Sequence, residues 1–140
     1  MEKYLGRFSA QLYAILRIVA GFMFMMHGTK KLFGWPGDGQ TVELASLMGL
    51  AGIIEFTGGL LIAIGLLAGW AAFIASGQMA VAYFKAHAPQ GWNPLENGGE
   101  LAALYCFLFL YMAAHGAGIW SVDAIRKKEK RADLEPQHHS

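Results

Sequence analysis

Between Leu44 and Phe84 the chain carries one charged residue, Glu55. A helix crosses the roughly 30 Å hydrocarbon core of a bilayer with about 20 residues, so this stretch is long enough for two crossings, and Ala68-Gly69-Trp70 is the natural turn between them. Helices satisfy their own backbone hydrogen bonds, as hydrocarbon requires, and no alternating strand pattern suggests a barrel. The stretch therefore predicts two transmembrane helices. The alternative, a soluble four-helix bundle, would need unusually long apolar helices.

Two more apolar segments flank this pair, the first containing Arg17 and the last interrupted only by His115. The predicted spans are residues 10–33, 47–68, 69–86 and 101–120. Charged residues make up 15% of the chain, against about 25% in soluble domains, and most lie outside these segments or at their ends. We expect an all-α fold, an integral membrane four-helix bundle in one domain over residues 1–125. A basic, polar cytoplasmic tail is expected over residues 126–140.

Basic residues determine the predicted orientation. Lys3, Arg7 and the cluster after the last span would lie at one end of the bundle, and the smaller set Lys30, Lys31 and Lys85 at the other. Cytoplasmic flanks carry the excess of Lys and Arg, so we expect both termini in the cytoplasm and a multi-pass protein of the bacterial inner membrane. Because the basic cluster is interpreted as a topology signal, no nucleic-acid partner is expected.

A signal peptide is the rival interpretation of the N-terminal segment. Arg17 interrupts its apolar run, and no small-x-small cleavage site follows. Both features are unlike a secretory signal. We therefore expect the first helix to be part of the mature bundle.

Ionisable residues inside a bilayer cost several kcal/mol unless they are paired, so each is a candidate for a functional site. Their positions along the helices separate them into two groups by depth. The outer group provides candidates for a substrate or proton site: Glu55, His27, Lys31, His87 and Glu100. The inner group provides candidates for a polar pair: Arg17, Asp123 and His115. Arg17 could pair with Asp123, and structural and functional roles for that pair stay equally open.

Glu55 is the most informative of these residues. Gly52, Gly58 and Gly59 lie three or four residues away and share its side of the helix. Small residues let a neighbouring helix approach closely, so Glu55 is predicted to point into the bundle, with His27 or Lys31 at a similar depth. The alternative is a glycine packing face with one structural ion pair.

The positions of the histidines and the single cysteine restrict which cofactors the chain could bind. His27 and His115 differ by about 17 Å in depth and cannot share one haem, and a metal between His27 and His87 is the less favoured interpretation. Cys106 is the single cysteine, which excludes dithiol chemistry within one chain. The sequence contains no nucleotide or flavin fingerprint, P-loop or catalytic serine motif. No metal site is predicted, and a quinone is the candidate cofactor.

Five short patterns, in this order, resemble those of the DoxX family of four-helix inner-membrane proteins. They are Arg17-Ile-Val-Ala-Gly21, His27-Gly-Thr-Lys30-Lys31-Leu32, Gly52-x-x-Glu55-x-x-Gly58-Gly59, Asn97-Gly98-Gly99-Glu100 and Gly116-Ala-Gly-Ile-Trp-Ser121-Val-Asp123. The resemblance implies a component of a membrane redox system, related to the small subunit of a thiosulfate:quinone oxidoreductase or to partners in thiol or detoxification complexes. It assigns no catalytic residue. Ala117 stands where many relatives would have proline.

Three functions are compatible with these features. A redox accessory, working with other redox proteins of the membrane or periplasm, predicts an aromatic-lined cavity between the helices near Glu55. A solute or proton pathway predicts a polar route from Glu55 to Arg17, with Gln78 between them. A non-catalytic anchor or assembly partner predicts paired charges and a closed bundle. The redox accessory is favoured through the resemblance, and both catalytic activity and homo-oligomer formation stay open.

Overall fold

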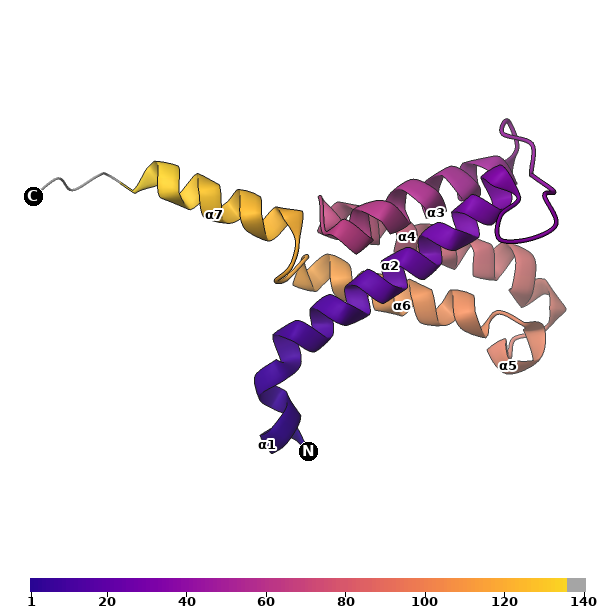
Figure 1. The fold of residues 1–140 in the computed structure, drawn as a ribbon. Coiled ribbons are helices and arrows are strands. Elements are labelled where there is room, and N and C mark those ends of the chain that lie inside the picture. The colour runs from indigo at the N-terminus through magenta and orange to yellow at the C-terminus, as the bar shows by residue number, and fades with distance from the viewer. Residues whose placement is uncertain (136–140) are drawn as a thin grey trace, which may run out of the picture.

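The computed structural model describes residues 1–135, and every regular element within them is helical. The elements are α1 (Glu2–Leu5), η1 (Gly6–Phe8), α2 (Ser9–Phe33), α3 (Leu47–Ile64), α4 (Ala68–Ala82), the π-helix η2 (Tyr83–His87), η3 (Ala88–Gln90), α5 (Pro94–Asn97), α6 (Glu100–His115) and α7 (Val122–Leu134). The helices α2, α3, α4 and α6 form the bundle (Figure 1). The expected all-α class is confirmed.

Glycines allow α2 and α3 to pack backbone against backbone. A Cβ added to Gly21 would lie 2.6 Å from the Ala63 amide nitrogen, and Cβ atoms on Gly28 or Gly59 would also collide with the backbone of the facing helix. Such close approach without side chains between the helices is a common way to associate helices in lipid. The glycine pattern noted around Glu55 therefore builds the α2–α3 interface.

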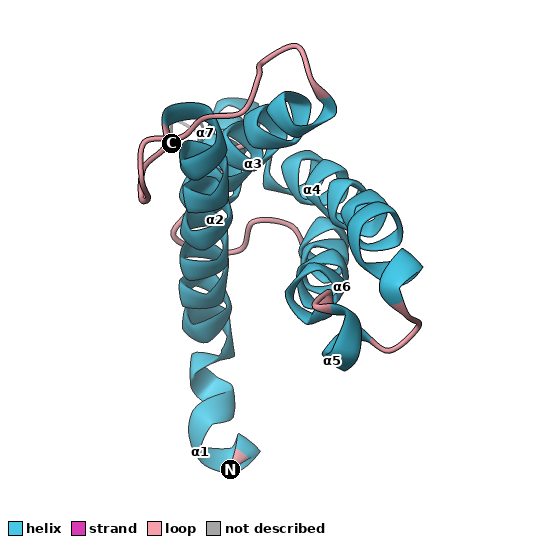
Figure 2. Cartoon of the chain, turned by 90° about the vertical axis from the view of Figure 1, so that its right-hand side faces the viewer, coloured by secondary structure: helices cyan, strands magenta, loops and turns pink. Residues whose placement is uncertain are grey.

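Small side chains also let α4 and α6 approach each other closely. Aromatic rings fill the space between α2 and α6. Ser76 donates a hydrogen bond to the Cys106 carbonyl at 2.7 Å. The Phe24 ring meets the Tyr105 and Phe109 rings edge-on, at centroid distances of 5.6 and 4.9 Å. Because rings rather than backbones bridge this side, α2 and α6 stand farther apart than the other neighbours, as Figure 2 shows.

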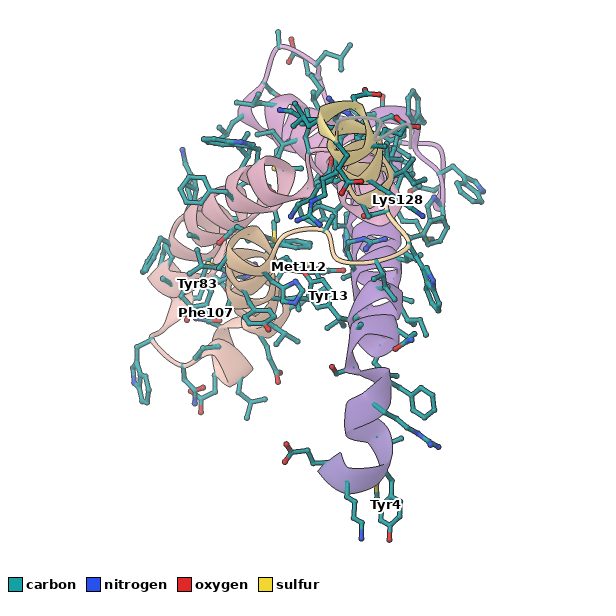
Figure 3. All side chains as sticks on the ribbon, turned by 90° about the vertical axis from the view of Figure 1, so that its left-hand side faces the viewer. Tyr4, Tyr13, Tyr83, Phe107, Met112 and Lys128 are labelled. Carbon is teal, nitrogen blue, oxygen red and sulfur yellow. The ribbon has the colours of Figure 1, made fainter. Side chains whose placement is uncertain are left out.

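Apolar side chains also cover the outside of the bundle. Exposed large residues occur on all four helices, among them Ile15 and Phe22 of α2, Ile53 and Leu60 of α3, Phe73 and Ile74 of α4, and Leu104 and Phe107 of α6. Figure 3 shows Phe107 pointing outward, whereas Tyr13 and Met112 lie between α2 and α6. Two helical segments, Glu2–Phe33 and Leu47–Ile64, are long and apolar enough to cross a membrane. An exterior of this kind is suited to lipid.

The helices differ from the predicted spans at three ends. α3 ends at Ile64 rather than at residue 68, and residues 65–67 form the turn, so the turn predicted at Ala68-Gly69-Trp70 is wrong and these residues begin α4. The α-helix of α4 stops at Ala82 and continues as the π-helix η2, and α6 ends at His115 although the predicted span continued to residue 120. Gly116 and Gly118 adopt positive φ angles of 88° and 73°, which an α-helix cannot contain. Residues 117–120 therefore lie outside any helix, between the end of α6 and the start of α7.

The predicted tail begins as a helix. Ser121 accepts a hydrogen bond from the Ala124 amide at 3.1 Å and so caps α7. This helix projects away from the bundle, and both α1 and α7 lie away from the end that carries α5 and the 34–46 loop (Figure 1). Residues 136–140 of the predicted tail lie outside the described residues.

Candidate functional site

Glu55 is buried in the bundle and paired with Lys31. Its side chain is 3% exposed, and the Lys31 ammonium donates to both carboxylate oxygens, at 2.7 Å to Oε1 and 2.6 Å to Oε2. Lys31 is therefore the partner of Glu55. The sequence had left both His27 and Lys31 open. Within residues 1–135 this is the single salt bridge.

The glycines between α2 and α3 bring Lys31 close enough to Glu55 to form this ion pair. Gly28 lies one turn before Lys31 on α2, and Gly52 lies one turn before Glu55 on α3. A Cβ on Gly52 would stand 3.2 Å from the Lys31 Cβ. Because no side chain separates the two backbones here, Lys31 extends directly to the carboxylate.

Glu55 lies at the edge of a cavity of about 720 Å³ between the four bundle helices. Its polar lining consists of Glu55, Lys31, His27, Gln78, Lys85, His87 and Tyr105. The rest of the wall is mainly aliphatic, and Phe24 and Tyr105 are its two aromatic side chains apart from the histidines. The lining is thus less aromatic than the quinone hypothesis expected, although the cavity does lie beside Glu55.

Three polar side chains surround the carboxylate side of this cavity. The Gln78 amide nitrogen lies 3.4 Å from Glu55 Oε1. The His27 ring meets the Tyr105 ring edge-on at a centroid distance of 6.3 Å. The Gln78 amide oxygen and the Tyr105 hydroxyl are both buried without a hydrogen-bond partner in the described part of the chain. Such unpaired atoms are few in folded proteins, which marks this corner as a candidate binding site.

The other two outer candidates differ in position. His87 lines the cavity, and its Nδ1 lies 3.2 Å from the Asn97 carbonyl oxygen. Glu100 is exposed in the first turn of α6 and does not line the cavity. A carboxylate there interacts favourably with the positive end of the helix dipole. The structure therefore brings together four of the five outer candidates and leaves Glu100 outside.

Asn97 organises the loop above the cavity, although sequence analysis did not select it. Its amide nitrogen donates to the Tyr83 hydroxyl at 3.2 Å and to the Gly91 carbonyl at 2.9 Å, and its oxygen accepts from the Gly99 amide at 2.8 Å. In the sequence it is part of the Asn97-Gly98-Gly99-Glu100 pattern, which contributed to the family resemblance but assigned no role to Asn97. Tyr105 was also missed, and its hydroxyl within an apolar helix was the available signal.

Arg17 is 1% exposed and does not form the predicted ion pair with Asp123. Its guanidinium donates to four backbone carbonyls: Ile62 at 3.1 Å, Ile119 at 3.0 Å, Trp120 at 2.8 Å, and Ala117. The non-helical segment after α6 supplies three of these oxygens. The planar Arg17 guanidinium carries several N–H donors and can bind several acceptors at once. Backbone carbonyl dipoles rather than a carboxylate therefore compensate its buried charge.

Asp123 caps α4 instead. Its carboxylate accepts from the Leu67 and Ala68 amides at 2.9 and 3.0 Å, while its own amide donates to the Gly65 carbonyl at 2.9 Å. A carboxylate at a helix N-terminus satisfies donors that have no partner within the helix. Asp123 thus joins the α3–α4 turn to the start of α7.

His115 belongs to a third environment. The centroid of its ring lies 3.9 Å from the centroid of the Tyr13 ring. The Tyr13 hydroxyl donates a hydrogen bond to the Gly116 carbonyl at 2.7 Å. Neither Arg17 nor Asp123 is bonded to it. The three inner candidates therefore act separately, each supporting the end of the bundle near Gly116–Asp123. The structure does not bring them together as one polar site.

An apolar core separates the two regions. Phe24, Ile62, Ala72, Ala75, Phe109 and Met112 are among its buried members. Within residues 1–135 no group of three or more His, Cys, Asp or Glu side chains is arranged to hold a metal ion. The cavity beside Glu55 is the candidate ligand site, and the apolar core separates it from the Arg17 end of the bundle.

Comparison with known proteins points to one family. The DoxX family profile matches residues 12–88. An uncharacterized protein of Haemophilus influenzae is 43% identical over 131 residues, covering 88% of this chain and 93% of the relative. No solved structure matches.

Proposed function

The chain belongs to the DoxX family of membrane proteins, and on this basis we propose that it is an accessory subunit of a membrane redox system that holds a quinone-type ligand beside Glu55. The ligand would lie in the cavity between the four helices, with its polar ring near Glu55 and Lys31. Other redox proteins of the membrane or periplasm would supply or accept the electrons. Glu55 and His27 would exchange protons with the ring.

The observation that carries this proposal is a polar corner in a mainly aliphatic cavity. A volume of about 720 Å³ lies within the range of small-molecule sites, which combine apolar walls with a few placed polar groups. The unpaired Tyr105 hydroxyl can donate to an oxygen of such a ring, and the unpaired Gln78 oxygen can accept from a hydroxyl on its reduced form. Both atoms belong to side chains of the cavity wall.

A solute or proton pathway is less well supported. Gln78 reaches Glu55 but lies on the outer side of the apolar core. Arg17 is saturated by backbone carbonyls and separated from Glu55 by residues such as Phe24 and Ile62. A polar route between the two charges would have to break this core.

A non-catalytic anchor is the second candidate, and α7 is the observation that favours it. This helix projects from the bundle with its basic side chains exposed, Arg126, Lys127, Lys128, Lys130 and Arg131. Paired charges, as at Lys31 and Glu55, also agree with an anchor. The cavity, in contrast, leaves the bundle less closed than an anchor requires.

For the membrane orientation we propose four crossings of the bacterial inner membrane with both termini in the cytoplasm. Basic α7 and the N-terminal Lys3 and Arg7 support this choice. Exposed tryptophans lie towards both ends of the bundle, Trp35 and Trp92 at one and Trp70 and Trp120 at the other. Tryptophan is enriched at the two membrane–water interfaces, so these positions fit a bundle aligned across the bilayer.

Titration of the purified protein in lipid nanodiscs with a short-tailed benzoquinone tests the ligand. We expect saturable binding that weakens after Glu55→Gln and after His27→Ala. Glu96→Gln, an exposed carboxylate of α5 outside the cavity lining, is the matched control. Thermal unfolding of each variant separates lost binding from lost folding. Absence of binding by the unmodified protein would remove the proposed function.

A further inference from the structure

Among residues 1–135, two side chains of the cavity wall each have one buried polar atom without a hydrogen-bond partner. These atoms are the Gln78 amide oxygen and the Tyr105 hydroxyl. Tyr105 is 5% exposed, so bulk water does not serve its hydroxyl. Leaving a buried polar atom unpaired is costly, and the pair therefore points to a ligand with complementary groups.

The orientation of the Gln78 amide determines which group that ligand must offer. The amide nitrogen lies 3.4 Å from Glu55 Oε1. A carboxylate paired with an ammonium only accepts hydrogen bonds, so turning the amide over would place two acceptors against each other. The free atom is therefore the oxygen, which only a donor can satisfy. The Tyr105 hydroxyl can donate or accept.

We propose that this cavity holds the reduced, hydroxyl-bearing form of its ligand, a hydroquinone, in preference to the oxidised quinone. This inference rests on the proposed function. Hydroxyls of a hydroquinone can donate to the Gln78 oxygen and accept from Tyr105. A quinone carbonyl accepts from Tyr105 but leaves the Gln78 oxygen without a donor. The oxidised form thus loses a hydrogen bond that the reduced form makes.

Part of the cavity wall is shared with the apolar exterior. Leu50 of α3 and Ile74 and Val81 of α4 line the cavity and are also among the exposed large residues of their helices. An apolar tail on the ring can therefore extend between α3 and α4 towards the acyl chains. The ligand class is a lipid-soluble hydroquinone with its ring inside the bundle and its tail towards the bilayer.

Equilibrium dialysis of the full chain in nanodiscs against a short-tailed benzoquinone, and separately against its hydroquinone kept reduced under nitrogen, tests this preference. We expect the hydroquinone to bind about ten-fold more tightly, the effect of one buried acceptor gaining its donor. Gln78→Met, which keeps the side-chain length and removes the acceptor, should abolish the preference. Gln90→Met, at an exposed glutamine outside the cavity lining, should retain it.

The outcomes separate this inference from the function on which it rests. Equal binding of the two forms, or tighter binding of the quinone, would overturn the preference while leaving a ligand site. A preference that survives Gln78→Met would also overturn it, because the acceptor would not be its source. Binding of neither form would overturn both the preference and the proposed function.

Discussion

Arg17 donates a hydrogen bond from Nη2 to the carbonyl oxygen of Trp120, 2.8 Å away and 103 residues later in the chain. The same guanidinium holds the carbonyls of Ala117 and Ile119. Residues 117–120 belong to no helix, so Arg17 satisfies backbone acceptors there that the membrane would leave unpaired. One side chain of α2 thus fixes the path from α6 to α7.

Arg17→Met should destabilise the protein by about 3 kcal/mol, because several buried carbonyls lose a charged donor at once. Arg17→Lys should recover only part of this loss, since an ammonium lacks the planar fork of donors. Thermal unfolding in detergent measures both changes. Arg126→Met, at an exposed arginine of α7, should have little effect. Equal stability of the Arg17 and Arg126 variants would contradict the role of Arg17.

Asp123→Ala should cost about 1 kcal/mol through loss of the cap on α4. The carboxylate is the acceptor for both the Leu67 and Ala68 amides. Asp133→Ala, at an exposed aspartate of α7, is the matched control. Hydrogen exchange at the start of α4 should rise in the first variant alone, and unchanged protection there would argue against a capping role.

The Lys31–Glu55 pair should show strong coupling in a double-mutant cycle. Lys31→Met leaves the buried Glu55 carboxylate without its partner, which typically costs about 3–5 kcal/mol. Glu55→Gln should cost less, because the Lys31 side chain left without its partner is 22% exposed. The double variant should cost clearly less than the two single changes added together. Unfolding free energies of the four proteins give the coupling. Additive losses would mean that the 2.6 Å contact contributes little.

Gly28→Ala and Gly77→Ala should change stability in opposite directions. A Cβ on Gly28 would collide with the backbone of Phe56, whereas a Cβ on Gly77 meets nothing within 4 Å. Overpacking typically costs about 1–3 kcal/mol, while alanine in place of an exposed helical glycine gains up to about 1 kcal/mol. The two unfolding temperatures test this contrast. Equal shifts would contradict the close α2–α3 contact.

The proposed orientation predicts which positions a membrane-impermeant thiol reagent reaches. In a Cys106→Ser background, Trp92→Cys should be labelled in intact spheroplasts, because Trp92 is exposed near the proposed outer end. Lys128→Cys, on exposed α7, should be labelled only after the membrane is permeabilised. The reverse pattern would place both termini outside the cytoplasm.

Much of the fold was predictable because lipid imposes simple requirements on a sequence. Long apolar segments and the glycines around Glu55 indicated the helices and the buried direction of this carboxylate, and the structure agrees on both. The partner of Glu55 was less certain, since His27 and Lys31 lie one turn apart on α2. Depth estimates cannot separate such neighbours, because the reach of a side chain depends on how closely the helices approach.

The local sequence determined the apolar segments and the presence of ionisable groups among them, because hydrophobicity and helical rise depend only on residue order. The turn between α3 and α4 was placed three residues too late, since Ala68, Gly69 and Trp70 begin α4. Tertiary structure decided the partners. Arg17 meets carbonyls rather than Asp123 because Gly116 and Gly118 interrupt the last helix and turn its backbone towards α2. It also decided that Gln78 and Tyr105, on different helices, share one cavity with unpaired polar atoms. Contacts between distant segments depend on how helices pack, and spacing along one helix does not contain that information.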